Sequence, residues 1–362
     1  MSVKSIFTRI FLLLPAVVLV FHVLAGPVEA ERSEAVTVLL YHRFDEPQYP
    51  TTNISRVALV AQMQYLRDKG YRAIGLDEFL NILDGRKKAT GREVLVTVDD
   101  GYRSVYEVAW PVFREYKVPF IVFVATAPIE KQYSSMMTWS QIEEMNHAGV
   151  IFGNHSHTHP HIGFMKKGET SDTYRRRVQD DVKAAAAVLG EHGISNTLFA
   201  YPYGEYNDTV VEVLQGLGYD VMFSQNPGVA YAGADRTRVD RMALVGENVS
   251  VDAFREKLSR LPLSAELMEP EEGVHSGTIS GVKIRLNNPG AYDPGQVNVF
   301  LSEKGRLEHR YLPESGVITY PGPLGLERGL NRIIVTARER TTRKFGMMSW
   351  LLLGPPERVP TD

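Results

Sequence analysis

Cysteine is absent from the 362-residue sequence. Its absence excludes structural disulfides, catalysis by a thiol and the lipid-modified cysteine that follows the signal peptide of a bacterial lipoprotein. If the chain is exported, its fold must therefore be held together by an apolar core, with any metal that it binds as an addition.

A strongly basic balance is absent as well. Lys and Arg number 40 against 43 for Asp and Glu, so the formal net charge is −3 and nucleic acid is not an expected partner. The sequence also has no heptads, no low-complexity tract and no internal repeat. Hydrophobic residues make up 44% and charged residues 23%, which is an ordinary globular balance. The length predicts two domains.

The first thirty residues are typical of a secretory signal peptide. Lys4 and Arg9 precede an apolar run over residues 10–23, and Val28 and Ala30 place small residues three and one positions before Glu31. We therefore expect cleavage after residue 30 and a secreted or periplasmic protein. An uncleaved membrane anchor is the alternative, but the run falls short of the roughly 20 residues of a comfortable span.

From residue 36 to about residue 260, continuous apolar segments alternate with amphipathic ones. This alternation predicts a parallel sheet covered by helices, within a first domain over residues 31–264. Pro111 is expected to kink its helix. The expected strands are 36–41, 94–98, 120–125, 150–153 and 197–200, and the expected helices centre on 59–66, 105–116, 178–189 and 210–217.

The pattern changes near residue 265. Residues 265–273 are rich in acids and contain Pro270, which indicates a linker. Beyond it the helical period disappears, and Pro-Gly pairs separate short apolar segments. We expect residues 274–357 to form a small β-sandwich. Its strand candidates are 282–286, 297–301, 317–320, 332–337 and 348–352.

Two adjacent carboxylates, Asp99 and Asp100, follow the second expected strand. Their mutual repulsion is unfavourable unless a cation or an arginine relieves it, so they are candidates for a metal or catalytic site. The alternative is a helix N-cap, where aspartate is common.

A cluster of histidines follows the fourth expected strand, in the segment Asn154-His-Ser-His-Thr-His-Pro-His161. His155 and His159 are four residues apart, and one helical turn would place both imidazoles on the same side, as two ligands of one metal require. His157 would then point elsewhere. The alternative is an exposed polar loop.

Two further segments end strands. Pro202 and Tyr203 form a proline-fixed turn that could aim a backbone N–H as an oxyanion hole does, although such turns are common. His42 ends the first strand, where a lone histidine is more often structural. In a parallel barrel all of these strand ends share one rim, the usual place of an active site. We therefore expect an α/β fold with an incomplete (β/α) barrel.

At these residues the chain resembles the NodB-type polysaccharide deacetylases of carbohydrate esterase family four, over residues 36–230. The family's carboxylate motif is matched by Thr-Val-Asp-Asp at residues 97–100, and its second motif by His-Ser-His-Thr-His at residues 155–159. The resemblance implies a metal-dependent hydrolase that removes N-acetyl groups from a polysaccharide and releases acetate.

Carried over position by position, the resemblance implies that Asp100, His155 and His159 bind one divalent metal ion. Asp99 would be the general base, and Tyr203 would offer its backbone N–H to the oxyanion. For two nitrogen ligands and one oxygen ligand, zinc is the expected metal, and cobalt, nickel or iron also suit the set.

Two departures refine the resemblance. Ala200 stands where most of the family has an arginine that steadies the base, and no histidine lies between His192 and His275 to serve as the acid. Both departures resemble the branch that acts on poly-β-1,6-N-acetylglucosamine and related exopolysaccharides. In that branch an N-terminal histidine is the acid, and His42 occupies its place.

Several alternatives stay open at this point. The polymer could be a chitin oligomer or peptidoglycan, and Ala200 keeps open a catalytically inactive carbohydrate-binding protein. Trp139 could form a wall of the sugar site or simply pack. Tyr102 and Arg103 could touch substrate or pack in a helix. The C-terminal β region could bind polysaccharide, contact an export assembly or a membrane partner, or brace the barrel.

Overall fold

The computed structural model describes residues 34–195 and 197–355. The predicted signal peptide lies outside these residues, so its cleavage stays a prediction. Among the described residues, no helix combines the length and the apolar character that crossing a membrane would require.

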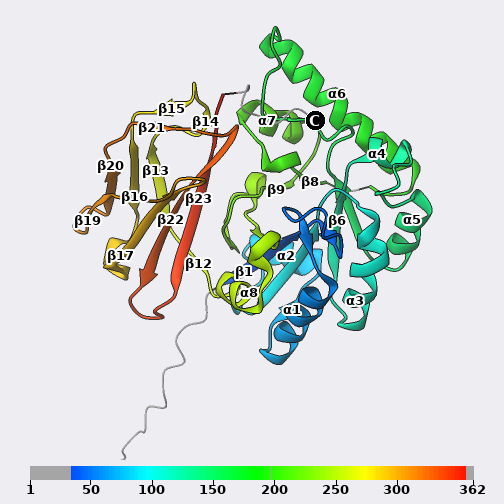
Figure 1. The fold of residues 1–362 in the computed structure, drawn as a ribbon, viewed down its shortest axis with the longest axis horizontal. Helices are drawn as coiled ribbons and strands as arrows, with labels where there is room; N and C mark the ends of the chain where they lie inside the picture. Colours follow the sequence, from blue (N-terminus) through cyan, green and yellow to red (C-terminus); the bar gives the residue numbers. More distant parts are fainter. Residues whose placement is uncertain (1–33, 196, 356–362) are drawn as a thin grey trace, which may run out of the picture. The chain divides into compact units, whose positions relative to one another are not determined.

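A parallel sheet forms the centre of the first two-thirds of the chain (Figure 1). Its strands are buried along their whole length or nearly so, which fits their unbroken apolar sequences, because a parallel sheet is covered on both faces. In spatial order the strands are β10 (Ala230–Tyr231), β1 (Ala35–Tyr41), β5 (Glu93–Val98), β6 (Phe120–Val124), β7 (Ile151–Asn154), β8 (Leu198–Ala200) and β9 (Val221–Phe223), with β4 (Arg72–Ala73) beside β5 and β11 (Met242–Ala243) beside β1. Strand β10 is antiparallel to β1, whereas the other neighbours are parallel.

Helices connect these strands. Side chains cap several of them: Thr138 and Thr170 each form a capping box, and Asn207 accepts a bond from the backbone of Val210. The helices are α1 (Arg56–Asp68), α2 (Leu76–Leu83), α3 (Trp110–Glu115), α4 (Thr126–Glu130), α5 (Trp139–His147), α6 (Ser171–Glu191), α7 (Asp208–Gly216) and α8 (Val251–Leu258), together with the short η2 (Pro202–Gly204), η3 (Arg236–Arg238), η4 (Gly246–Val249) and η5 (Pro289–Ala291).

The helix expected over residues 105–116 contains an irregularity, but of a different kind from a proline kink. A π-helical turn, η1 (Val105–Ala109), precedes α3, and Pro111 sits within the first turn of α3. The helical backbone runs from η1 into α3 without a break, so Pro111 lies inside a continuous helix directly after the π-helical turn. The sequence patterns did not reveal α2, α8 or the short strands β9 to β11.

One irregular segment, residues 239–244, spans the two ends of the parallel sheet. Val239 donates its backbone N–H to Met222 in β9 at 2.8 Å, and Leu244 donates to Leu40 in β1 at 2.9 Å. The sheet therefore curls into a half-barrel around an apolar interior, with this segment across the gap. This agrees with the incomplete barrel expected from the sequence.

Residues 261–355, called the β-rich region below, are almost entirely β-structure, as expected. One sheet has the order β12 (Leu261–Pro262), β23 (Phe345–Leu353), β22 (Leu330–Glu339), β17 (Tyr292–Leu301) and β18 (Gly305–Leu307), with β14 (Gly273–Val274) beside β23. A second has the order β13 (Ala265–Glu269), β16 (Val282–Leu286), β20 (Val317–Tyr320) and β19 (Arg310–Leu312). A small pair in this region is β15 (Thr278–Ile279) with β21 (Leu324–Gly325). Another small pair, β2 (Arg43–Phe44) with β3 (Asn53–Ile54), lies in the first part of the chain, between β1 and α1.

The prediction of a linker over residues 265–273 is wrong. Strand β13 pairs with β16, and β14 pairs with β23. The acids that suggested a linker lie on the outward side, since Glu266 and Glu269 are exposed, whereas Leu267 packs against the apolar core of the β-rich region. The described residues all belong to one compact unit rather than to two units joined by a flexible segment.

Strand β23 packs against both the half-barrel and the β-rich region, which explains why the two form one compact unit. Trp350 and Leu352 point into the core of the β-rich region, whereas Leu351 and Leu353 pack in a cluster with Tyr201 and helix α7 of the half-barrel. A strand that is buried on both faces reads as an unbroken apolar run, which is how residues 350–353 read.

Truncation of Leu351 tests this shared core. Leu351→Ala should lower the free energy of unfolding by about 2–5 kcal/mol, because the side chain is fully buried and leaves a cavity. Val274→Ala, at a 56% exposed position on neighbouring β14, is the control and should change it by less than about 0.5 kcal/mol. Chemical denaturation measures both, and equal effects would contradict the packing.

Candidate metal and catalytic site

A cleft of about 860 Å³ opens at the carboxyl ends of the parallel strands. The rim where the sequence placed its candidate residues therefore does surround one cavity. The lining residues from the half-barrel are His42, Thr51, Thr52, Asp100, Tyr102, His159, His161, Tyr203, Glu205 and Gln225, and those from the β-rich region are Ser302, Glu303, Arg328, Gly329, Leu330 and Arg332.

Asp100, His155 and His159 come together as a group that could hold a metal ion. The Oδ1 atom of Asp100 lies 3.2 Å from Nε2 of His155 and 3.3 Å from Nε2 of His159. One ligand atom from each of the three lies within 4.8 Å of the others. Two imidazole nitrogens and one carboxylate oxygen, with open positions toward a cleft, are the donor set of a catalytic zinc site.

His155 is prepared for the role of a ligand. Its Nδ1 atom lies 2.7 Å from the backbone carbonyl of Ala200, and because a carbonyl can only accept, the ring proton must be on Nδ1. The lone pair is then on Nε2, which is fully buried and has no hydrogen-bond partner. A buried acceptor without a partner is unfavourable unless a cation fills the place, so these residues fit a bound metal.

The histidine segment is not helical, contrary to the expectation from the spacing. Residues 155–161 form an irregular loop after β7, in which Ser156 and His159 adopt the left-handed conformation at φ 70° and 55°. Asn154 holds the loop by accepting from the backbone of Ser156 at 2.7 Å. His157 points away, as expected, and its Nδ1 lies 2.8 Å from the hydroxyl of Thr126.

Backbone strain is concentrated at this site. Of the nine non-glycine residues with positive φ among those described, four are Asp100, Ser156, His159 and Tyr203. Each such conformation is unfavourable by about 1–3 kcal/mol and persists only where the surroundings impose it. The concentration marks the rim as a site whose geometry is held at the expense of stability.

Asp99 is bound by an arginine that the sequence did not reveal. Arg241 donates Nη1–H to Oδ1 at 2.7 Å and Nη2–H to Oδ2 at 2.6 Å, and both side chains are fully buried. Burial raises the pKa of Asp99, but the charge of Arg241 outweighs it, so the pKa is lowered and the carboxylate stays ionised. Asp99 thus has an arginine partner although position 200 is an alanine.

Arg241 reaches Asp99 from the irregular segment that crosses the gap in the half-barrel. Its Nε donates to the carbonyl of Ser224 at 2.6 Å, and the guanidinium lies 5.9 Å from the ring centroids of Phe123 and Phe223. Locally, Arg241 follows Asp240 and precedes the apolar residues Met242 to Val245, a pattern that does not indicate a buried partner. Its partner could not be inferred, because 142 residues separate it from Asp99.

His42 ends β1 and lines the cleft, as expected. Its Nδ1 atom is buried without a hydrogen-bond partner. Burial lowers the pKa of His42, and the nearby charges of Asp100 and Asp99 oppose this change. The pKa of His42 stays lowered overall, because burial outweighs these two charges.

Tyr203 lies beside the candidate ligand His159, in the turn expected from its sequence. Its ring stacks on His161, with 4.1 Å between centroids, and Pro202 is the buried first residue of η2. His161 and Glu205 are two lining residues that sequence reasoning missed. Nδ1 of His161 lies 2.6 Å from the carboxylate of Glu205, whose pKa is raised because burial outweighs the nearby imidazole.

Three residues were candidates for contact with the substrate, and of these only Tyr102 lines the cleft, whereas Trp139 and Arg103 do not. Trp139 begins α5 and stacks on His192 at 3.9 Å between centroids; it does not line the cleft, so it packs and is not a sugar wall. Arg103 is also not among the lining residues, and its backbone bonds to Ser135. Tyr102 does line the cleft, beneath the guanidinium of Arg43 at 3.4 Å.

The buried ion pair predicts a compensation between two substitutions. Arg241→Met alone should destabilise the fold by about 3–5 kcal/mol, because it leaves the Asp99 charge buried and unpaired. Adding Asp99→Asn should recover most of that loss, since the remaining amide is neutral. Unfolding in denaturant measures all four members of the cycle, and additive losses would contradict the pairing.

The comparisons with known proteins agree with this geometry. Residues 86–222 match the family model described as "Polysaccharide deacetylase". The chain is 25% identical over 240 residues to the poly-beta-1,6-N-acetyl-D-glucosamine N-deacetylase of Escherichia coli strain K12, covering 56% of this chain and 35% of that protein. It is 27% identical over 201 residues to the enzyme of that name from Staphylococcus epidermidis. That match covers 54% of this chain and 67% of the relative.

The chain thus spans about a third of the Escherichia coli enzyme. Among solved structures, IcaB from Ammonifex degensii is 31% identical, with a TM-score of 0.54 over 61% of this chain and 97% of that one. On the family match and on this structure, the chain belongs to the polysaccharide deacetylase family, whose members are carbohydrate esterases and amidohydrolases acting on N-acetyl groups.

Proposed function

We propose that the protein removes N-acetyl groups from an exopolysaccharide that contains N-acetylglucosamine, of the poly-β-1,6-linked type, and releases acetate. The observation that carries the proposal is the buried Asp99–Arg241 pair directly beside the candidate ligands Asp100, His155 and His159. An ionised base, a metal site and an open cleft at one rim are what hydrolysis of an amide requires.

In this proposal Asp100, His155 and His159 hold one divalent ion, with zinc as the first choice and cobalt, nickel or iron as alternatives. A cation bound there polarises the acetyl carbonyl and lowers the pKa of a water molecule. Arg241 keeps Asp99 ionised and fixes the plane of its carboxylate, so that an oxygen lone pair can accept the proton of the attacking water.

The remaining two roles belong to Tyr203 and His42. The backbone N–H of Tyr203 would donate to the carbonyl oxygen as negative charge develops on it. His42 would give its proton to the sugar nitrogen as the C–N bond breaks, leaving a free amine and acetate. The proton taken up by Asp99 and the proton given by His42 then balance, and solvent resets both groups.

The choice of polymer rests on His42 and on the relatives. His42 provides a histidine for the acid role at the first strand, whereas the other histidines that line the cleft are the candidate ligand His159 and the partner of Glu205, His161. The Escherichia coli and Staphylococcus epidermidis relatives are named as poly-β-1,6-N-acetylglucosamine deacetylases. A chitin oligomer or peptidoglycan would use the same chemistry, so the linkage must be decided by assay.

A non-catalytic carbohydrate-binding protein is disfavoured by Arg241. The argument for it was that Ala200 left Asp99 without an arginine, and the structure supplies one from another segment. We further propose that residues 1–30 direct export, so that the enzyme meets its polymer in the periplasm or outside the cell.

A matched pair of histidine variants tests the metal site. His155→Ala should lower kcat/KM for acetate release from a β-1,6-linked oligomer by at least about 100-fold, with loss of tightly bound zinc. His157→Ala is the control, because this side chain is two residues away but turned toward Thr126. It should retain both acetate release and tightly bound zinc. Coupled acetate detection and equilibrium dialysis measure them. If His155→Ala were as active as the wild type, the assignment of the metal site would be refuted. If the wild-type protein released no acetate from any acetylated oligomer, the proposed function would be refuted.

The acid role of His42 predicts a dependence on the leaving group. His42→Gln should slow hydrolysis of the N-acetyl amide by about 100-fold or more, because the sugar amine must be protonated to leave. Hydrolysis of p-nitrophenyl acetate should fall by much less, since nitrophenolate leaves without a proton. Equal losses on the two substrates would remove His42 from the role of acid.

A further inference from the structure

We propose that the β-rich region supplies a substrate-binding residue to the cleft: Arg332, on β22, donates an N–H to a sugar oxygen of the polymer. The identity of the ligand as an acetylated polysaccharide rests on the proposed function. The place of Arg332 in the cleft does not, because it follows from the geometry alone.

One wall of the cleft comes from the β-rich region. Leu330 and Arg332 on β22, Arg328 just before it, and Ser302 and Glu303 after β17 all line the cavity that contains Asp100 and His159. Residues more than 200 positions apart in the sequence thus face one space. A polymer bound over the metal site would contact this wall as well as the rim of the half-barrel.

The guanidinium of Arg332 has an unused donor. Its Nε donates to Oδ1 of Asn226 at 3.1 Å, while its Nη2 is buried and has no hydrogen-bond partner among the described residues. No described carboxylate forms an ion pair with it. A buried cationic donor left unsatisfied is unfavourable by about 1–3 kcal/mol, so a small shift of the guanidinium that brings this donor to a ligand oxygen in the cleft would gain a charge-assisted hydrogen bond.

This donor lies at the turn that carries Tyr203. A Cβ atom placed on Gly204 would be only 3.0 Å from Nη2 of Arg332, so the guanidinium rests against the backbone of that turn. Gly204 also has φ +75°, which the turn requires and which favours glycine. A sugar unit near the oxyanion position would therefore lie within reach of Arg332.

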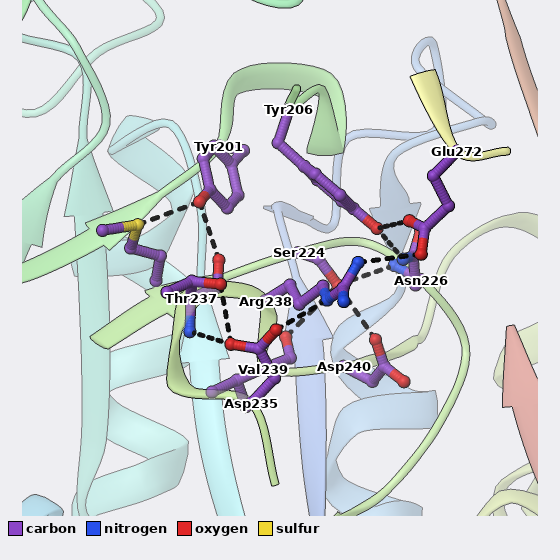
Figure 2. A network of polar contacts seen from close by, with 11 residues as sticks. Tyr201, Tyr206, Ser224, Asn226, Asp235, Thr237, Arg238, Val239, Asp240 and Glu272 are labelled. Atoms are coloured by element: carbon purple, nitrogen blue, oxygen red, sulfur yellow. Dashed lines mark hydrogen bonds and ion pairs between the residues drawn. The ribbon is translucent and has the colours of Figure 1, made fainter. Parts of the chain in front are cut away.

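A polar network holds Arg332 in place. Asn226, its partner, donates Nδ2–H to the hydroxyl of Tyr206 at 2.7 Å, and Tyr206 donates to Glu272 at 3.3 Å, as Figure 2 shows. Arg238 also donates to Glu272, at 2.8 Å. On the strand itself, the backbone N–H of Arg332 donates to the hydroxyl of Ser302 at 2.8 Å. The donor is thus preorganised, and binding need not order it.

The surroundings favour a neutral sugar oxygen, of a hydroxyl or an acetamido group, over a carboxylate. Glu205 and Glu303 line the same cleft and would repel a second anion. Arg328 is already paired with Glu303 at 2.9 Å, which leaves Arg332 as the donor available for an uncharged acceptor on this wall.

The experiment uses the whole zinc-loaded protein and two substrates. One is the β-1,6-linked N-acetylglucosamine pentamer, whose sugar oxygens can accept from Arg332, and the other is p-nitrophenyl acetate, which has no sugar oxygen. Arg332→Met should raise KM for the pentamer about 10-fold with kcat within about 2-fold, because one charge-assisted hydrogen bond is lost. Arg332→Gln, which keeps an N–H donor, should recover part of the loss. Hydrolysis of the ester should be unchanged.

Arg338→Met is the matched control. Arg338 lies on the same strand, is partly buried and donates to Asp293 at 2.9 Å, but it does not line the cleft. It should leave KM for the pentamer unchanged. Thermal unfolding of both variants measures any loss of stability. The proposal is overturned if Arg332→Met leaves KM for the pentamer unchanged. It is also overturned if Arg332→Met slows hydrolysis of the ester as much as that of the pentamer, or if Arg338→Met raises KM for the pentamer as much as Arg332→Met does.

Failure of the proposed function is recognised separately. If the wild type releases no acetate from the pentamer, that function is wrong, and calorimetric titration of the pentamer into wild type and Arg332→Met then decides the inference. About 10-fold weaker binding by the variant supports it. Equal affinities, or no binding by either protein, overturn it.

Discussion

The buried ion pair between Asp99 and Arg241 is the constraint on which the site depends. Two fully buried charges are tolerated only when each satisfies the other, so the end of β5 and the segment over residues 239–244 must stay in register. That segment also spans the gap between β9 and β1. The same contact therefore closes the half-barrel and keeps the candidate base ionised and oriented.

The neighbouring ligands are held in a different way. Asp100 follows Asp99 in the left-handed conformation, and His159 is brought back toward it by a strained loop rather than by a helical turn. His155 is fixed by a hydrogen bond to the backbone of Ala200. Burial would raise the pKa of Asp100, but the nearby imidazoles of His159 and His42 help to keep it well below its usual value. The carboxylate is thus ready to bind a cation.

The β-rich region contributes side chains both to a core shared with the half-barrel and to the cleft. Strand β23 shares its two faces between two cores, and β22 brings Arg332 to the cleft. Beneath that wall, the network of Tyr206, Asn226 and Glu272 joins the two parts (Figure 2). Burial raises the pKa of neighbouring Asp240 to about 8, so this network carries a carboxyl group that is largely neutral at pH 7.

The sequence by itself determined the parallel strands, most of the larger helices, the late β-strands and the identities of the metal-site candidates. Those features depend on local apolar periodicity and on side chains that follow strands directly, as Asp100 and His155 do. Only the tertiary structure decided the partner of Asp99, the packing role of Trp139 and the contribution of Arg332. Each depends on which segments distant in sequence lie together. Arg241 and Arg332 stand in segments with no local sign of a partner, and the curl of the sheet and the packing of β23 bring them to the site.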